Sequence, residues 1–351
     1  KRQMFERYHM HIDYAYRTFK WTSEAKEKAA VFCVIVGFSQ IGNTQKIIYT
    51  SSGQPELVKH INPYLVDAKD VFIESRRTPI CDVPAIGIGN KPIDDGNYLF
   101  DEAEMEAFIK AEPASKPYFK PWYGSREFIN RKPRYCLWVG DATPSELRKM
   151  PHVLERIQKV QEFRLASKSA GTRKLAERPT HFHVENMPTT NFLVIPKVSS
   201  EKRRYIPIGY MTPDSLVGDA VLIIPDANIY EFGVLTSNVH MAWMRTVAGR
   251  LKSDYRYSAK VVYNNFPWPH VTADQQAKIA ETAQQILDAR ALYPDSSYAD
   301  LYDERTMPSE LRKAHQNNDR AVMRAYGMDV ATTTEGDSVA KLFTLYAHLA
   351  K

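Results

Sequence analysis

The sequence predicts an α+β protein built from three unlike stretches. Near the N-terminus lie two runs rich in β-forming residues, His11–Trp21 and Ala29–Ser39. In the middle, short apolar runs alternate with proline, glycine and aspartate, which is typical of short strands and turns. After Pro269, helix-start signals are followed by apolar residues at helical spacing. We therefore expect a small β element, a mixed α/β region and a helical C-terminal region.

The two N-terminal runs predict an antiparallel hairpin joined by the polar loop Thr22–Lys28. The second run is apolar without alternation from Ala29 to Val36, as expected of a strand covered on both faces. We therefore expect the hairpin to belong to a larger α/β sheet whose other strands are missing from this chain. The chain also opens on Lys1 without an initiator methionine, which suggests a piece of a longer polypeptide. An uncovered apolar strand would favour self-association or packing by another domain.

The middle region begins with an irregular stretch, from Gln40 to about Trp138, that is punctuated by proline and glycine. Thr143, Pro144 and Glu146 then predict a helix start with a capping box. Beyond Pro151, apolar residues at helical spacing predict a basic helix, which runs into a flexible segment at residues 167–174. Four later apolar runs predict strands: Phe192–Ile195, Tyr205–Ile208, Ala220–Ile224 and Ile229–Leu235. Thr236–Leu251 is interpreted as a helix.

The C-terminal region predicts three helices. Thr272 with Gln275 forms a capping box that opens the first helix, which ends near Leu292. Pro308 opens the second helix, which Gly327 ends. Thr332 with Glu335 predicts the start of the third, whose core-facing residues are Val339, Leu342, Phe343, Tyr346 and Leu349. These helices are expected to form a cap or small bundle.

Charge is distributed unevenly along the chain. Residues 145–260 carry 18 Lys and Arg against 11 Asp and Glu, whereas residues 261–351 carry 9 against 12. A net positive stretch in an otherwise balanced protein indicates a polyanionic partner, most commonly DNA. The alternative is that these charges lie on solvated helix faces.

Other compositional features restrict the protein class. No apolar run is long enough to cross a membrane, so a membrane partner is not expected. The cysteines Cys33, Cys81 and Cys136 are widely separated. An odd, scattered set favours a reducing, cytoplasmic location and argues against a disulfide framework or a zinc site.

Three short motifs suggest chemistry, but each has a simpler interpretation. Asp13 with Glu24-Ala25-Lys26 resembles the D…E-x-K pattern of metal-dependent nucleases, although Glu24 and Lys26 fall in the predicted hairpin loop. Gly87–Asn90 (GIGN) lacks the third glycine and the helix of a nucleotide loop and is interpreted as a turn. His181 and His183 are interpreted as structural or DNA-contacting, because no cysteine or carboxylate cluster completes a metal site. We expect no metal site, and no G-x-S-x-G motif supports a serine nucleophile.

Tyr263–Pro269 (YNNFPWP) invites comparison with the loop by which adenine-N6 methyltransferases hold a flipped base. That loop has an Asp or Asn followed by two prolines and an aromatic residue. Here Asn265 is followed by Phe266, so the segment alone predicts a rigid aromatic loop at a domain junction.

Two segments carry side chains suited to DNA bases. Residues 199–205 (SSEKRRY) place three cations before a predicted strand, and residues 236–240 (TSNVH) place polar side chains at a helix start. Arginine and lysine suit guanine O6 and N7, asparagine suits adenine, and helix N-termini suit phosphates. Both segments would be ordinary polar loops if they faced only solvent.

Long blocks of the sequence resemble the C-terminal half of MmeI-like (type IIL/IIG) adenine-specific DNA methyltransferases. These blocks are RTFKWTSEAKEKAAVFCVIVGFS, YFKPWYGSREFINRKPRYCLW, LRKMP, EFRLASKS, RRYIPIGY, FGVLTSNVHMAWMRTVAGRLKSDYRYS and VYNNFPWP. The resemblance covers essentially the whole chain. It implies that residues 1–50 are the C-terminal remnant of a class I methyltransferase domain, 51–270 a DNA target recognition domain and 271–351 a helical C-terminal domain.

The resemblance also implies a function. The parent enzyme is expected to transfer a methyl group from S-adenosylmethionine to adenine N6 within a restriction–modification system. The family's cofactor loop and Pro-Pro catalytic loop lie upstream of this chain, so we expect no catalytic residues, no cofactor and no activity in the chain alone. Its expected partners are double-stranded DNA and the upstream methyltransferase domain of the same polypeptide.

The resemblance and donor chemistry together suggest which residues contact DNA. Those expected at base edges are Lys202, Arg203, Ser237, Asn238 and His240. Those expected at the DNA backbone are Tyr123, Arg126, Arg156, Lys159, Arg164, Lys168, Arg173, Lys174, Arg204, Arg245, Arg250, Lys252 and Arg256.

Two alternatives from other classes remain open. The chain could be a protein-interaction module that docks on a partner subunit, in which case binding would depend little on salt. It could instead be a stand-alone nuclease, whose magnesium-dependent cleavage would require Glu24.

Overall fold

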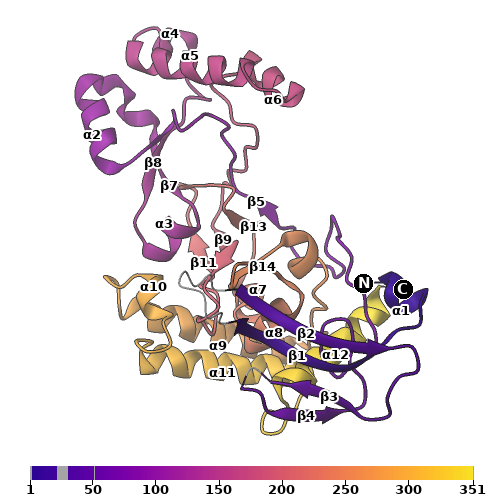
Figure 1. The fold of residues 1–351 in the computed structure, drawn as a ribbon. Helices are drawn as coiled ribbons and strands as arrows, with labels where there is room; N and C mark the ends of the chain where they lie inside the picture. Colours follow the sequence, from indigo (N-terminus) through magenta and orange to yellow (C-terminus); the bar gives the residue numbers. More distant parts are fainter. Residues whose placement is uncertain (1, 22–30, 51, 351) are drawn as a thin grey trace.

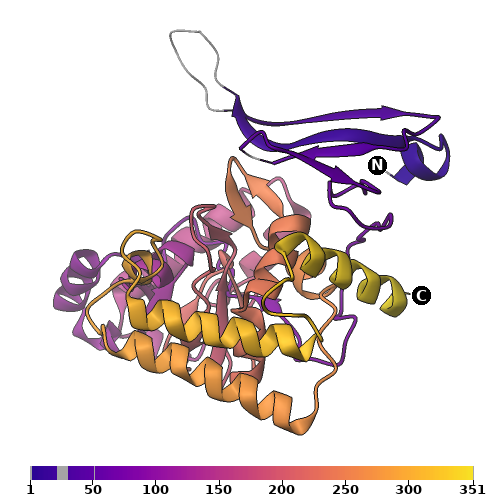
Figure 2. The same cartoon turned by 90° about the horizontal axis from the view of Figure 1, so that it is seen from below.

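The computed structural model describes residues 2–21, 31–50 and 52–350 and has the mixed α/β architecture expected from the sequence (Figure 1). Within these residues the strands form four small sheets. Helices α9 (Ala273–Ala291) and α11 (Ser309–Ala325) run side by side along one edge of the molecule (Figure 2). No helix in the described part of the chain is both long and apolar enough to cross a membrane.

The first sheet contains the predicted hairpin and forms a layer of its own above the rest of the molecule in Figure 2. Strand β1 (His11–Trp21) follows the short helix α1 (Arg2–Glu6) and pairs antiparallel with β2 (Val31–Ser39). Two strands that were not predicted complete it: β3 (Lys46–Tyr49), parallel to β1, and β4 (Pro55–Val58). On β2, Val34, Ile35 and Phe38 are exposed, so part of this apolar strand is uncovered.

The central sheet lies in the main core. Its middle strands, β9 (Phe192–Pro196) and β13 (Val221–Pro225), are almost wholly buried and confirm two of the predicted strands. Strands β5 (Gly87–Ile88) and β11 (Gly209–Met211) flank them. Residues 205–208, predicted as a strand, are buried but irregular and lead into β11. Gly87–Asn90 is therefore not a plain turn, because part of it is a sheet edge.

A second lobe contains the later part of the region that looked irregular in sequence. Its sheet consists of β6 (Leu99–Phe100), β7 (Phe119–Tyr123), β8 (Arg134–Leu137) and β12 (Leu216–Val217). Its helices are α2 (Glu102–Ala111), η1 (Pro113–Tyr118), α3 (Ser125–Asn130), α4 (Pro144–Leu147), α5 (Pro151–Leu165), α6 (Ala170–Lys174) and η2 (Leu175–Glu177). The Thr143 capping box and the basic helix are confirmed. The expectation of a flexible segment at 167–174 was wrong, since Ser169 caps α6 there.

The segment 229–235, predicted as a strand, is instead helix α7 (Ile229–Leu235). Asn228 caps its N-terminus and Glu231 completes a capping box. Every residue of α7 from Tyr230 to Leu235 is buried, so no amphipathic pattern marks it as a helix. Gly233 lets α9 approach closely, because a Cβ there would lie 2.8 Å from Ile279 Cγ2.

The predicted helix 236–251 ends earlier than expected. Helix α8 (Asn238–Val247) begins at the Ser237 cap and is followed by the hairpin β14 (Gly249–Leu251) and β15 (Asp254–Arg256). Strand β10 (Val198–Ser199) pairs with β15. The π-helix η3 (Ala259–Tyr263) then leads into the buried aromatic loop that ends at Pro269.

The C-terminal helices are α9 (Ala273–Ala291), α10 (Tyr298–Leu301), α11 (Ser309–Ala325) and α12 (Glu335–Leu349). The Thr272–Gln275 capping box is confirmed, whereas α12 is capped by Thr334 and Asp337 instead of Thr332 and Glu335. One continuous apolar core joins these helices to the central region, and it includes Leu193, Phe232, Trp243, Leu311 and Phe343. The tail is therefore packed into the middle region as one folded unit.

Candidate nucleic-acid interface

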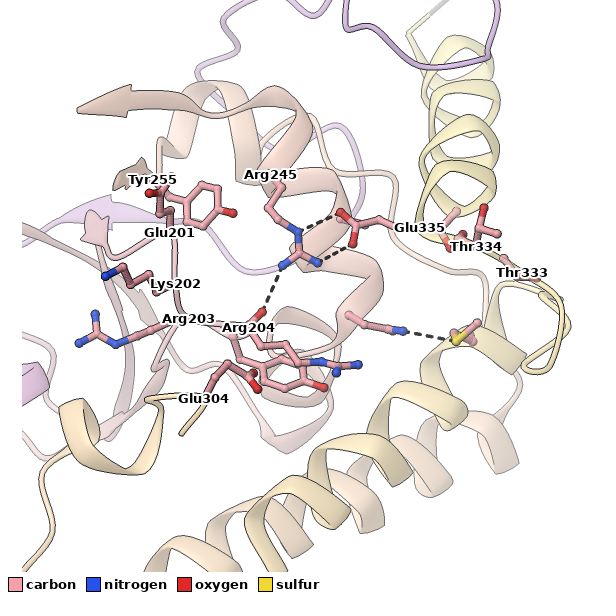
Figure 3. A pocket seen from close by; sticks show the side chains of 15 residues that line it. Glu201, Lys202, Arg203, Arg204, Arg245, Tyr255, Glu304, Thr333, Thr334 and Glu335 are labelled. Atoms are coloured by element: carbon pink, nitrogen blue, oxygen red, sulfur yellow. Dashed lines mark hydrogen bonds and ion pairs between the residues drawn. The ribbon is translucent and has the colours of Figure 1, made fainter. Parts of the chain in front are cut away.

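Three of the five residues expected at base edges come together around one cavity. Lys202, Arg203 and Asn238 line a cavity of about 570 Å³, together with Arg204 and Arg245 (Figure 3). The three consecutive cations lie on the loop between β10 and β11, while Asn238 and Arg245 lie on α8. Residues 333–335, at the start of α12, complete the rim. The cavity therefore lies between the middle region and the C-terminal helices.

The loop that carries the cations is anchored to the neighbouring hairpin. The N–H of Arg203 donates to the Ser200 carbonyl at 3.1 Å, which closes a turn. The N–H of Glu201 donates to Asp254 Oδ1 at 3.4 Å, which links the loop to β15. Burial lowers the pKa of the Arg203 guanidinium, while the nearby Asp254 and Asp303 carboxylates oppose this shift. Arg203 thus points into a partly enclosed, acidic environment, whereas Lys202 and Arg204 are exposed.

Arg245 is held in an ion pair at the rim. Its guanidinium forms two hydrogen bonds of 2.9 Å with the Glu335 carboxylate and donates to the Arg204 carbonyl at 3.2 Å (Figure 3). Glu201 and Glu304 also line the cavity. The cavity therefore has mixed charge, in which Glu335 neutralises one of the cations.

Two expected base contacts, Ser237 and His240, are instead part of the core. Ser237 is fully buried, and its hydroxyl caps α8 by accepting from the His240 N–H at 3.3 Å. His240 is 1% exposed, its Nε2 lies 2.8 Å from the Tyr257 hydroxyl, and burial lowers its pKa to about 3. Both predictions are corrected, because neither side chain can reach a DNA base from this position.

The β14–β15 hairpin supplies exposed cations beside the cavity. Arg250, Lys252 and Arg256 are all exposed. The Arg250 guanidinium lies over the Tyr255 ring at 4.1 Å, and Tyr255 also lines the cavity. Pairing of β15 with β10 keeps these cations next to the Lys202–Arg204 loop. This arrangement is suited to contacts with a polyanion backbone.

The other expected backbone contacts lie on the second lobe, at the top of Figure 1. Lys159, Lys168, Arg173 and Lys174 are exposed on or beside α5 and α6, and Arg126 is exposed on α3. Tyr123 is half-buried on β7. Arg156 lies over the Phe100 ring at 4.9 Å, and Lys159 pairs with Glu155 at 2.7 Å. These cations form a second group, separate from the cavity.

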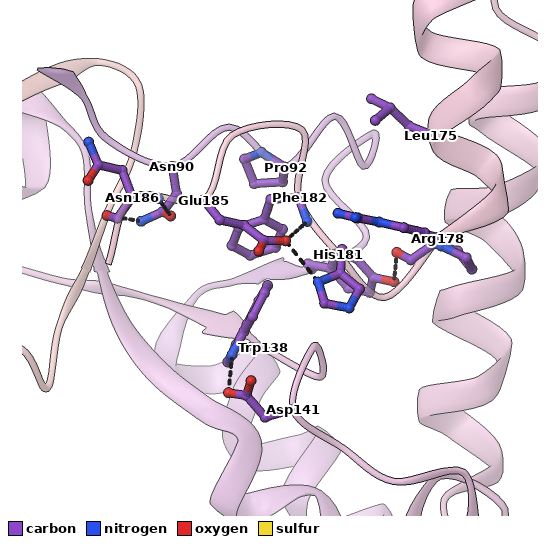
Figure 4. A network of polar contacts seen from close by, with 12 residues as sticks. Asn90, Pro92, Trp138, Asp141, Leu175, Arg178, His181, Phe182, Glu185 and Asn186 are labelled. Carbon is purple, nitrogen blue, oxygen red and sulfur yellow. Dashed lines mark hydrogen bonds and ion pairs between the residues drawn. The ribbon is translucent and has the colours of Figure 1, made fainter. Parts of the chain in front are cut away.

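Arg164 does not belong to that group. Its side chain is fully buried and donates to the carbonyl oxygens of Pro92, Ile93, Leu175, Arg178 and His181 at 2.8–3.0 Å. Figure 4 shows the surroundings of this network, including Pro92, Leu175, Arg178 and His181. The prediction that Arg164 contacts DNA phosphates is corrected, because every direction of its guanidinium is already used inside the lobe.

The remaining motifs also have structural roles. Asp13 pairs with the buried Lys46 at 3.6 Å, whereas Glu24 and Lys26 lie outside the described residues. His181 Nδ1 lies 3.0 Å from Glu185 Oε1 (Figure 4). The side-chain amide of Asn265 is fully buried and donates to the carbonyls of Glu74, Lys260 and Val261. In the part of the chain that the structure describes, no three His, Cys, Asp or Glu residues gather as metal ligands.

The glycine segment 87–90 does not fit a nucleotide-like cofactor. Gly87 and Ile88 pair with β13, and a Cβ at Gly89 would lie 2.4 Å from the Gly218 carbonyl oxygen. These glycines therefore serve close backbone packing, and no helix N-terminus follows them to receive a phosphate.

The acidic residues of the site carry no sequence signal that marks them as part of it. Glu201, Glu304 and Glu335 line the cavity, and Asp319 lies buried beneath it. In the sequence, the pattern around Glu335 predicts only a capping box. No sequence pattern could have paired it with Arg245, 90 residues earlier in the chain.

Comparison with known proteins gives consistent matches. Family models for MmeI match along the chain: the DNA-methyltransferase domain at residues 2–50, the target recognition domain at 67–270 and the C-terminal domain at 271–351. DNA methyltransferase A of Bacillus subtilis (strain 168) is 42% identical over 316 residues, which is 90% of this chain and 36% of that protein.

A solved structure of the type IIL restriction-modification enzyme MmeI in complex with DNA is also similar. It is 47% identical with a TM-score of 0.90, over 97% of this chain and 46% of that one. The chain thus spans less than half the length of each of these two relatives.

Proposed function

Because the chain belongs to the MmeI family, we propose that it reads a double-stranded DNA sequence as the target-recognition part of an adenine-N6 DNA methyltransferase in a restriction–modification system. The observation that carries this proposal is the grouping of Lys202, Arg203 and Asn238 around one cavity beside an exposed basic hairpin. Lysine and arginine donors recognise guanine edges, and asparagine recognises adenine. Exposed cations next to them would contact phosphates and set the register on the duplex.

Within this proposal the residues have different roles. Lys202 and Arg203 are the primary candidates for base contacts. Asn238 lies beside them, but its side-chain amide donates to Met323 Sδ at 3.5 Å and its Oδ1 is buried, so it would have to turn to reach a base. Arg204, Arg245, Arg250, Lys252 and Arg256 are candidates for the backbone near the cavity. Tyr123, Arg126, Arg156, Lys159, Lys168, Arg173 and Lys174 would contact a more distant stretch of the same duplex. Such a role would place the protein with DNA in the cytoplasm.

Methyl transfer itself would use residues outside the described part of this chain. S-adenosylmethionine supplies the methyl group in such enzymes, but the glycine segment at 87–90 does not fit it. The contribution of this chain would be to bind the duplex and hold it in register for a methyltransferase domain of the same polypeptide.

The exposed apolar side chains of β2 are the proposed contact with that domain. Val34, Ile35 and Phe38 are exposed on a strand within residues 2–50, which match the methyltransferase family model. Covering them with further methyltransferase structure would remove this apolar surface from water. Self-association of the chain through the same side chains is the alternative, and it would appear as concentration-dependent mass in light scattering.

Selection from a pool of randomised DNA duplexes tests the recognition role. The intact polypeptide should select a defined sequence, and Lys202→Ala or Arg203→Ala should relax the preference at one base pair by about 1–3 kcal/mol. Lys174→Ala is the matched control on the second lobe and should weaken binding equally for all sequences. If Lys202→Ala and Arg203→Ala instead lose affinity equally for all sequences, both residues contact phosphates and not bases.

Salt dependence separates this function from a protein-interaction module. DNA binding should weaken steeply as salt rises, because each neutralised phosphate releases counterions. The affinity for a protein partner bound through the exposed apolar side chains of β2 should change little with salt. If affinity for duplex DNA is insensitive to salt, the interaction module becomes the better description.

A further inference from the structure

A single buried carboxylate connects the C-terminal helices to both sides of the proposed reading cavity. Asp319, on α11, is 5% exposed. Its Oδ2 accepts from the Tyr205 hydroxyl at 2.6 Å, and its Oδ1 accepts from the backbone N–H of Asn238 at 2.8 Å. Tyr205 directly follows the Lys202–Arg204 loop, and Asn238 is the first residue of α8.

The segment that follows the loop is held at both ends by the same helical region. At its start, the Tyr205 ring stacks on His315 of α11, with ring centroids 4.1 Å apart. At its end, the Ile208 carbonyl accepts from Arg290 Nη1 of α9 at 2.7 Å. Residues 205–208 form no strand, so sheet pairing does not fix this segment. The contacts with α9 and α11 take that role.

Burying a carboxylate costs free energy unless the group accepts strong hydrogen bonds. Burial raises the pKa of Asp319 to about 6, and its two donors oppose that shift. The carboxylate therefore remains mostly ionised near neutral pH and makes short, charge-assisted bonds. A neutral apolar residue would fill the same space without fixing the direction of either donor.

We propose that Asp319 is a positioning residue for DNA sequence recognition, whose carboxylate fixes the Lys202–Arg204 loop relative to the N-terminus of α8. This inference rests on the proposed function. Asp319 itself is buried and touches no DNA; it acts through Tyr205 and Asn238. The helical tail would thus contribute to base selection from beneath the cavity.

The chain offers a matched control next to Asp319. Asn318, also on α11 and fully buried, donates to the Gly233 carbonyl at 2.8 Å and accepts from the Thr282 hydroxyl at 3.2 Å. It therefore anchors α11 to α7 and α9 but not to the loop. Asn318→Ala should disturb helix packing to a similar extent while leaving the loop in place.

The experiment compares binding of the intact polypeptide to its selected duplex and to variants of that duplex at the base pair assigned to Lys202. Asp319→Ala should reduce this preference about tenfold, as a misplaced base-edge contact would. Asp319→Asn should keep it within about threefold, because its amide retains the shape, keeps one acceptor for the Asn238 N–H and can donate to the Tyr205 hydroxyl oxygen. Asn318→Ala should keep it, whatever its effect on thermal stability.

A double-mutant cycle tests whether Asp319 acts through the loop. If it does, Lys202→Ala combined with Asp319→Ala should show no greater loss of preference than Lys202→Ala alone. Additive losses, an unchanged preference in Asp319→Ala, or an equal loss in Asn318→Ala would overturn the inference.

A further variant covers the case in which Asp319→Ala does not fold. Tyr205→Phe removes only the hydroxyl and keeps the ring stacked on His315. It should lose preference at the same base pair, and an unchanged preference in this folded variant would overturn the inference. If the unmodified polypeptide selects no sequence at all, the proposed function itself fails, and this inference fails with it.

Discussion

Replacing Arg164 by alanine tests whether this buried cation supports the fold or contacts DNA. Of the five carbonyl oxygens that accept from its guanidinium, those of Leu175 and Arg178 also accept backbone N–H groups. For Pro92, Ile93 and His181, Arg164 is the donor that the structure describes. Leaving a buried carbonyl without a donor costs about 1–3 kcal/mol. Three such carbonyl groups should lower the free energy of unfolding by about 3–9 kcal/mol, with the lower values expected if water enters the space left by the side chain.

Two measurements check this value. Urea unfolding should show a large loss of stability for Arg164→Ala, and hydrogen exchange should accelerate at least about a hundredfold in the segments around Pro92 and residues 175–182. Lys159→Ala, on the exposed side of α5, breaks only the pair with Glu155 and should change stability by less than about 1 kcal/mol. An Arg164→Ala protein that is as stable as the parent but binds DNA less tightly would show that Arg164 contacts a phosphate and does not support the fold.

Two further predictions follow from the titrating and charged groups. His240 and His315 are buried and neutral, because burial lowers their pKa values. Below about pH 6.5 the unfolded chain therefore binds more protons than the folded chain. The free energy of unfolding should fall by about 1.4 kcal/mol per pH unit for each histidine. The pKa of Asp319 is raised to about 6, so below that pH the folded chain gains a proton there, and this stabilisation offsets the loss from one histidine. If urea unfolding shows no decline in the free energy of unfolding across this pH range, the histidines are not buried in the neutral form. Glu335→Gln removes the carboxylate that neutralises Arg245 and should tighten binding to duplex DNA of any sequence, with a salt slope steeper by up to about one ion. Unchanged or weaker binding in a salt titration would show that Arg245 does not contact phosphate.

Sequence patterns predicted the elements that have one apolar face or a clear cap. The β1–β2 hairpin, the basic helix α5 and the helices α9 and α11 were all predicted close to their observed bounds. Each has strong local signals, either continuous apolar runs or capping residues. The resemblance to a known family then indicated function more specifically than any single motif.

The errors have identifiable physical causes. Helix α7 is buried on all sides, so its apolar run matched a strand as well as a helix, and the Asn228 cap was the overlooked signal. Ser237 and His240 have donor chemistry suited to bases, but a sequence does not show that α8 is packed on both flanks. Arg164 was grouped with exposed cations because its carbonyl acceptors come from segments up to 72 residues away.

The shared apolar core has a practical consequence for building hybrids between related enzymes. Side chains from Val66 to Tyr346 pack in one interior, so a cut at the junction near Pro269 would divide it. A graft limited to residues 67–270 would place side chains from another protein against helices α9, α11 and α12. It would also separate Tyr205 from its native partner Asp319. Exchange of specificity between relatives should therefore succeed when the donor segment carries its own tail helices with it.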